Sequence, residues 1–248
     1  EPPCPWNALV CSSASKNGHL DVLKWLRSQK PPCPWDTNVC TTAAIRRDWN
    51  MLKWARAQKP PCPWSAGVYH NAARHGQLDL IQWGRAQNPA CPWNADVTAN
   101  AAQNGQLGVL KWLRSQNPPC PWDTYVCWYA AQLGHLDMLR WAREQDPPCP
   151  WDALVCANAA WKGHLDVLKW LRAQEPPCPW DARVCENAAK GGHLDVLMWA
   201  RAQEFPVSLN SFVLKNAIRY GHLPVLQWLH GLNATFPSSA AAGDAALN

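Results

Sequence analysis

The chain has 248 residues, 48% hydrophobic and 17% charged, which is enough apolar material for a folded protein. Its 23 basic residues are mixed with 18 acidic ones, so the net charge of +5 arises without a block of like charges. The charge composition therefore gives no indication of binding to nucleic acid or to a membrane surface. No apolar run is long enough to predict a bilayer span.

Tryptophan recurs in two series with one shared period. The first series follows a Cys-Pro pair in each case: Trp6, Trp35, Trp64, Trp93, Trp122, Trp151 and Trp180. The second series keeps the same 29-residue spacing: Trp25, Trp54, Trp83, Trp112, Trp141, Trp170, Trp199 and Trp228. This period predicts eight repeats, 1–29, 30–58, 59–87, 88–116, 117–145, 146–174, 175–203 and 204–232, followed by a tail, 233–248.

Each repeat carries the start and stop signals of two helices. An Asp or Asn after the first Trp, such as Asp152, suits a helix N-cap because its side chain accepts free backbone N–H groups. A glycine follows the first helix, such as Gly163, and it suits a helix C-terminus with a left-handed backbone. The second helix is expected to stop at the proline pair Pro176-Pro177, because proline removes a donor and clashes with the preceding turn. The sequence thus predicts an all-α solenoid of helix–turn–helix repeats.

The two predicted helices differ in their apolar faces. Val10 and Ala14 share one face of the first helix, and Val and Ala hold these two places in all eight repeats. Small residues there would let neighbouring first helices approach closely. The second helix, Leu165 to Arg172, is apolar over most of its circumference, which predicts that it is sandwiched between neighbours. Trp170 is accordingly expected to fill the core between repeats.

The stretch Asn158 to Leu171 resembles the Ala-Ala-x-x-Gly-His-x-x-Val-x-x-x-Leu core of the ankyrin repeat. The resemblance covers residues 1–232 and recurs in every repeat, although Arg47-Asp48 replace Gly-His in the second. Ankyrin repeats have 33 residues and a β-hairpin finger, where this chain has Pro-Pro-Cys-Pro-Trp. It is similar to the divergent Cys-Pro-Trp ankyrin-like repeats of giant viruses and some algae and protists. The resemblance implies an ankyrin-like solenoid with reduced or absent β-hairpin fingers.

The cysteines and histidines of one repeat could form a metal site, but the equivalent residues of other repeats argue against it. Cys149, Cys156 and His164 would form a conceivable zinc set. However, Tyr69 and Thr98 replace the second Cys in two otherwise intact repeats, and a metal needed for folding would not tolerate this. We therefore expect no metal and no cofactor. Buried free thiols are favoured over disulfides, with a bridge from Cys149 to Cys156 kept as an alternative. The histidines are expected to cap or to bond within turns.

The tryptophan and arginine series could each bind nucleic acid, but we prefer a structural role for both. The tryptophans could stack on single-stranded nucleic acid, but a period-locked Trp beside Val and Leu is typical of a core. The arginine series from Arg27 to Arg201 could bind phosphates. It alternates with aspartates such as Asp166, which favours a salt-linked convex surface. Nucleic acid is therefore not expected as a partner, although a nucleic-acid-binding solenoid remains the rival hypothesis.

The predicted binding site lies where the repeats differ, on the first-helix face opposite Val and Ala. No other pair of neighbouring repeats than the fifth and sixth places large aromatic side chains there. We define these residues as the aromatic patch: Tyr125, Trp128, Tyr129, Gln132, Leu133, Leu154 and Trp161. Exposed aromatic clusters mark interaction sites, and Trp and Tyr dominate interface hot spots. The alternative is that these rings fill a local gap.

These observations predict a protein-binding scaffold rather than an enzyme, since every candidate catalytic residue is a repeat copy. A structural subunit of a larger assembly is a further alternative. A reducing intracellular compartment is expected from the thiols. Because the sequence starts at Glu1, we expect it to be trimmed or incomplete, with localisation signals lost. The first repeat has no polar specialisation, so either further N-terminal repeats or a partner are expected to cover it. The last repeat is interpreted as a C-terminal cap, and 233–248 as a mobile tail.

Overall fold

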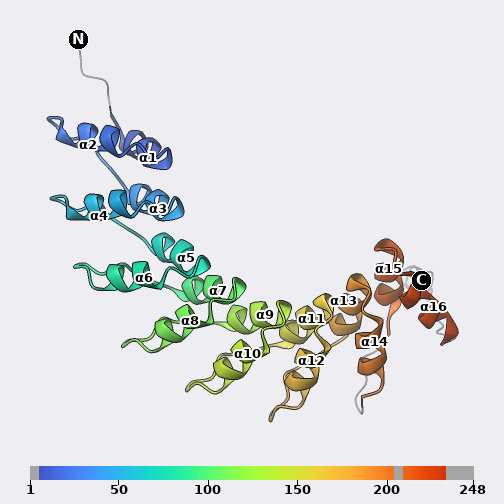
Figure 1. Ribbon diagram of the computed structural model, residues 1–248. Helices are drawn as coiled ribbons and strands as arrows, with labels where there is room; N and C mark the ends of the chain where they lie inside the picture. Colours follow the sequence, from blue (N-terminus) through green and yellow to red (C-terminus); the bar gives the residue numbers. More distant parts are fainter. Residues whose placement is uncertain (1–5, 204–208, 233–248) are drawn as a thin grey trace, which may run out of the picture. The chain divides into compact units, whose positions relative to one another are not determined.

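The computed structural model describes residues 6–203 and 209–232, and over these ranges the backbone forms α-helices without a strand (Figure 1). The chain divides into two compact halves, an N-terminal half, Glu1–Trp122, and a C-terminal half, Asp123–Asn248. The N-terminal half contains α1 (Ala8–Lys16), α2 (Leu20–Ser28), α3 (Thr37–Ile45), α4 (Trp49–Ala57), α5 (Gly67–Arg74), α6 (Leu78–Arg85), α7 (Ala95–Gln103) and α8 (Leu107–Arg114).

The C-terminal half has the same alternation of first and second helices. It contains α9 (Thr124–Gln132), α10 (Leu136–Arg143), α11 (Ala153–Lys162), α12 (Leu165–Arg172), α13 (Arg183–Gly191), α14 (Leu194–Arg201), α15 (Ser211–Arg219) and α16 (Leu223–Gly231). Second helices begin every 29 residues, from Leu20 to Leu223. The predicted all-α fold of repeated helix pairs is confirmed. Residues 204–208 of the predicted C-terminal cap and the whole predicted tail, 233–248, lie outside the described residues. The boundaries of the repeats stay a prediction.

Most first helices begin and end at or beside the capping residues that the sequence predicts. The Asp152 carboxylate accepts a hydrogen bond from the Leu154 amide at 2.9 Å and starts α11. Gly163 ends α11 with φ of 76°, a left-handed conformation that glycine adopts without steric cost. In the second repeat Arg47 takes this place with φ of 58°. Among the Asp and Asn residues that cap described helices, Asn94 is the exception, because its side chain makes no cap bond to α7.

The core of each half lies between consecutive first helices, which contact one another extensively. In the C-terminal half, α9 packs on α11, α11 on α13, and α13 on α15 (Figure 1). The small side chains of Ala159 and Ala160 on α11 are fully buried, as are those of Val155 and Cys156. This confirms that the conserved Val and Ala positions face the neighbouring first helices.

The second helices are less enclosed than the sequence suggested. Val167, Leu168 and Leu171 on α12 are fully buried, but Trp170 is only half-buried. Its ring meets the loop residue Trp151 edge to face, with 6.3 Å between centroids. The prediction that Trp170 fills the core between repeats is therefore wrong. The small residues draw the first helices together, whereas each second helix packs on its own first helix and loop.

An arginine of the preceding repeat binds each described Cys-Pro-Trp loop. The expectation that these arginines form a salt-linked surface with aspartates is therefore wrong. In the C-terminal half, Arg172 donates from Nη1 to the Cys178 carbonyl oxygen at 2.6 Å. Its guanidinium also lies 4.5 Å from the centroid of Trp180. The same pair of contacts recurs at Arg27, Arg56, Arg85, Arg114 and Arg143. The guanidinium is planar, so it can stack on indole and donate in its plane.

Cysteines in the loops join repeats in a different pairing from the one considered above. Cys149 points its thiol at the Asp123 carbonyl oxygen of the preceding repeat, 3.4 Å away. Cys127 on α9 lies 3.9 Å from the Cys149 carbonyl oxygen, measured from its sulfur. A hydrogen bond from the Cys149 side chain, with burial, raises the pKa of Cys127. Cys149 therefore neighbours Cys127 of the preceding repeat, while Cys156 interacts with Cys178 of the next repeat.

Histidines at the start of the second helices also join repeats, and their side chains make no cap bond within their own helix. His193 Nε2 donates to the Trp161 carbonyl oxygen at 3.1 Å. His164 reaches the Gln132 carbonyl oxygen at 3.1 Å in the same way, and His222 reaches that of Lys190 at 2.9 Å. The histidines therefore bind a carbonyl oxygen near the end of a first helix in the preceding repeat, and do not cap the helix that they begin.

Candidate functional site

Three rings of the aromatic patch form one cluster on α9. Trp128 and Tyr129 lie 4.6 Å apart between centroids, and Tyr125 lies 5.6 Å from Trp128 and 6.2 Å from Tyr129. The three positions share one side of the helix because residues three or four apart are neighbours. Ring pairs at these separations are mutually attractive beyond their burial. The sequence-based grouping of these three residues is thus matched by direct ring contacts.

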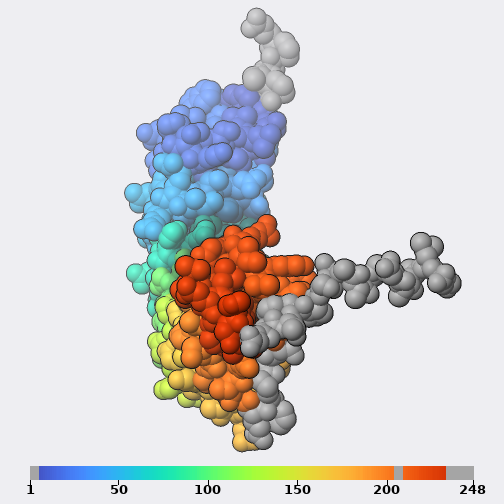
Figure 2. All heavy atoms as spheres, turned by 90° about the vertical axis from the view of Figure 1, so that its right-hand side faces the viewer, coloured from blue at the N-terminus to red at the C-terminus, as the bar shows by residue number. Residues whose placement is uncertain are grey.

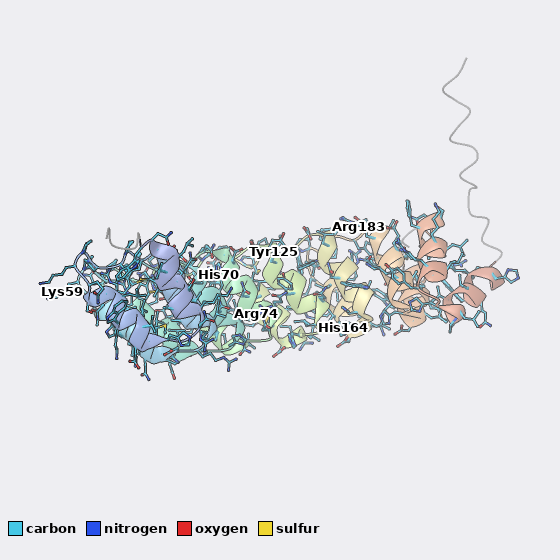
Figure 3. The ribbon with its side chains drawn as sticks, turned by 90° about the horizontal axis from the view of Figure 1, so that it is seen from above. Lys59, His70, Arg74, Tyr125, His164 and Arg183 are labelled. Carbon is cyan, nitrogen blue, oxygen red and sulfur yellow. The ribbon has the colours of Figure 1, made fainter. Side chains whose placement is uncertain are left out.

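The cluster is accessible from solvent. Tyr125 is 51% exposed, and Leu133 at the other end of α9 is 40% exposed. Trp128, Tyr129 and Gln132 are half-buried. Figure 3 shows that Tyr125 projects from the same edge of the C-terminal half as Arg183, while His164 lies at the opposite edge. Tyr125 therefore projects into solvent, whereas Trp128 and Tyr129 are partly covered.

The hydroxyl of Tyr129 remains a hydrogen-bond donor over the ordinary pH range. Burial is the main reason that the pKa of Tyr129 is raised, and the neighbouring Tyr125 and Asp123 raise it further. Neutral phenol groups with apolar ring faces can contact both apolar and polar groups of a partner.

The two patch residues on α11 extend the surface beyond α9. Leu154 is 40% exposed near the start of α11, which packs directly on α9. Trp161 is half-buried near its end, and its ring contacts are with cations. The ammonium groups of Lys162 and Lys190 lie 4.2 and 4.7 Å from the Trp161 centroid. Sequence reasoning missed these lysines, although Lys190 holds the same repeat position as Trp161 and could have been found by aligning the repeats.

The remaining side chains offer little for metal binding or covalent chemistry within the described residues. Among residues 6–203 and 209–232, no group of three or more His, Cys, Asp or Glu side chains could hold a metal ion. The eleven cysteines in these ranges are all buried as free thiols. In the N-terminal half, a hollow of about 340 Å³ is lined by Trp49, Lys53, Asp79 and Trp83, a set without a nucleophile and base.

No described helix is both long and apolar enough to span a lipid bilayer. No protein-family model and no curated protein matches this sequence. Among solved structures, the chain is similar to the pentatricopeptide repeat protein PPR10, crystallised with an 18-nt psaJ RNA element, with a TM-score of 0.45 and 12% identity. That alignment covers 91% of this chain but only 38% of PPR10.

The chain is also similar to an ankyrin repeat family protein from Legionella pneumophila, with a TM-score of 0.24 and 16% identity. This alignment covers 88% of this chain and 77% of the other. These two proteins belong to helical-repeat classes, and the helix pairs described above place the present chain among helical-repeat proteins. The expectation that nucleic acid is not a partner stays a prediction.

Proposed function

We propose that this protein is a binding scaffold that holds another protein through the aromatic patch on α9 and α11. The observation that carries the proposal is the exposed cluster of Tyr125, Trp128 and Tyr129, whose rings contact one another. Large aromatic side chains on a surface are unfavourable in water and become favourable when a partner covers them. A rigid helix also presents them with little loss of conformational entropy on binding.

The remainder of the surface supports binding over catalysis. Buried helix contacts, loop arginines and inter-repeat histidines account for residues that recur in most repeats, so these groups stabilise the stack. Several of the residues that vary between repeats, such as Tyr125 and Leu154, are exposed on the first helices. In repeat proteins this arrangement lets the sequence of one face change for a partner while the stack is kept.

The double substitution Trp128→Ala with Tyr129→Ala tests the proposal. We expect a loss of at least about 2 kcal/mol in binding free energy, because two hot-spot rings are removed. The partner would be captured from the source cell on the immobilised full chain, identified by mass spectrometry and titrated by calorimetry. Helix content and melting temperature should change little, since the substitutions leave the buried residues of α9, Val126, Cys127, Ala130 and Ala131, in place.

A matched control removes exposed apolar side chains from first helices of the other half. Leu9 and Ile45 are 66% and 53% exposed, and Leu9→Ala with Ile45→Ala should leave partner affinity unchanged. Wild-type affinity in the Trp128/Tyr129 variant would show that the patch is not the binding site. Binding of RNA in place of a protein would favour the rival nucleic-acid hypothesis.

A further inference from the structure

A row of cations and rings continues from the aromatic patch across α11, α13 and α15. We define the lysine strip as Trp161, Lys162, Lys190, Phe212, Lys215 and Tyr220. The Lys190 ammonium on α13 lies 4.7 Å from the Trp161 centroid on α11 and 5.8 Å from that of Tyr220, just after α15. Lys215 lies 5.3 Å from the Phe212 centroid on α15. The strip therefore links three consecutive first helices.

The strip carries positive charge that nearby carboxylates do not neutralise. Helices α11, α13 and α15 hold five basic residues and one acidic residue, Glu186. The Glu186 carboxylate accepts a hydrogen bond from Asn210 at 2.6 Å, and the nearby Asp181 pairs with Arg183. Across the described part of the chain, the ion pairs within 4.0 Å leave Lys162, Lys190 and Lys215 without a carboxylate partner. An anionic partner would complement this surface.

Apolar side chains flank these cations and face solvent. Phe212 is 57% exposed and Ile218 on the same helix is 60% exposed, while Tyr220 is 47% exposed. Figure 2 shows atoms of this last described repeat, α15 and α16, in orange-red toward the viewer. Trp161 belongs to both the strip and the aromatic patch, and its helix α11 packs on α9. Cations and aromatic rings thus lie beside one another from α11 to α15.

From these contacts we propose that the lysine strip binds an extended acidic segment of another protein, in which carboxylates alternate with apolar side chains. This inference rests on the proposed function, because the segment would continue onto the aromatic patch. Carboxylates would meet the ammonium groups, and apolar side chains would cover Phe212, Ile218 and Tyr220. Single-stranded nucleic acid fits less well, since base stacking needs open ring faces, and two ammonium groups already lie near the Trp161 ring.

The length of the segment follows from helix packing. Neighbouring helices pack about 8–10 Å apart, so α11 to α15 spans on the order of 20 Å. An extended chain covers roughly 3.3–3.6 Å per residue, so about six residues cross the strip. A fluorescein-labelled peptide of alternating Glu and Leu, about ten residues long to allow overhang at both ends, is a sufficient probe.

Fluorescence anisotropy on the full chain tests the inference. The triple variant Lys162→Gln, Lys190→Gln and Lys215→Gln should bind the Glu/Leu peptide about tenfold or more weakly, because three cation contacts are lost. The control variant Lys24→Gln, Lys111→Gln and Lys169→Gln removes the same charge from exposed lysines on second helices. This control should retain wild-type affinity, and a Gln/Leu peptide should bind weakly to the wild type.

Three results would overturn the inference: equal losses in both triple variants, equal binding of the Gln/Leu peptide, or tighter binding of an oligouridylate of matched charge. Melting curves of both variants establish that each is folded. Failure here is separable from failure of the proposed function. A strip variant that keeps its captured partner while the Trp128/Tyr129 variant loses it would overturn only the acidic-segment inference.

Discussion

At the scale of single residues, two effects oppose a side chain at the left-handed glycines between paired helices: backbone strain and a clash with the next repeat. A comparison of Gly163 with Gly221 separates them. Gly163 has φ of 76°, and a Cβ atom there would overlap the ring of His193 from the next repeat. Gly221 has φ of 74°, yet a Cβ atom there would meet nothing within 4 Å. Backbone strain acts at both positions, whereas the clash with histidine acts only at Gly163.

Gly221→Ala should therefore lower the free energy of unfolding by about 1–2 kcal/mol, the cost of a left-handed alanine. Gly163→Ala should lower it further, because His193 must leave its bond to the Trp161 carbonyl oxygen. Urea denaturation of both variants measures the difference. Equal losses would show that the histidine adjusts without cost and that this contact between repeats contributes nothing.

At the scale of elements, the arginines at the ends of the second helices hold the Cys-Pro-Trp loops in place. Arg172 at the end of α12 binds the carbonyl oxygen of Cys178 and stacks on Trp180, which in turn meets Trp199 of α14 at 5.7 Å. Helix, loop and following helix are thereby coupled through one guanidinium. A lysine could supply the charge but could not stack and donate in one plane.

We expect Arg172→Lys to lower the free energy of unfolding by about 1–2 kcal/mol, through the weakened hydrogen bond and the lost stacking. Arg201 holds the same repeat position, but Leu209 stands where the other repeats have the loop tryptophan. Arg201→Lys should thus change stability little. A denaturation experiment in which the two variants lose equal stability would contradict the coupling role.

At the scale of the whole molecule, buried thiols recur in both halves and link stability to alkaline pH. Burial raises the pKa of Cys120 in the N-terminal half to about 12. Burial also raises the pKa of Cys185 in the C-terminal half to about 12. A raised folded-state pKa means that the folded protein holds its proton where the unfolded chain releases it. The stabilising contribution is complete below the unfolded-state pKa of about 9 and is lost as pH rises toward 12.

The free energy of unfolding should therefore fall between about pH 8 and pH 10, the range in which unfolded thiols ionise. Denaturant titrations across this range would measure the slope. The variant Cys120→Ala with Cys185→Ala should show a shallower slope, because two of the linked groups are removed. An unchanged slope in that variant would show that other groups cause the alkaline loss.

The sequence by itself determined the elements whose causes are local. Helix starts at Asp152, left-handed ends at Gly163 and stops before the proline pairs depend on neighbouring residues along the chain. The alternation of small and large side chains also identified the buried face of the first helices. In the candidate site, the spacing of Tyr125, Trp128 and Tyr129 on one helix was sufficient to group their rings, because helical geometry brings residues three and four apart together.

Only the tertiary structure decided which repeat each periodic residue contacts. A strict period places Cys149 equally well beside a residue of its own repeat or of the preceding one, and the structure shows the preceding one. The arginines were similarly ambiguous between aspartates and loop carbonyls. Lys190 reached Trp161 only because small residues let α11 and α13 pack closely. Such contacts depend on the distance between stacked helices, which a repeat period alone does not specify.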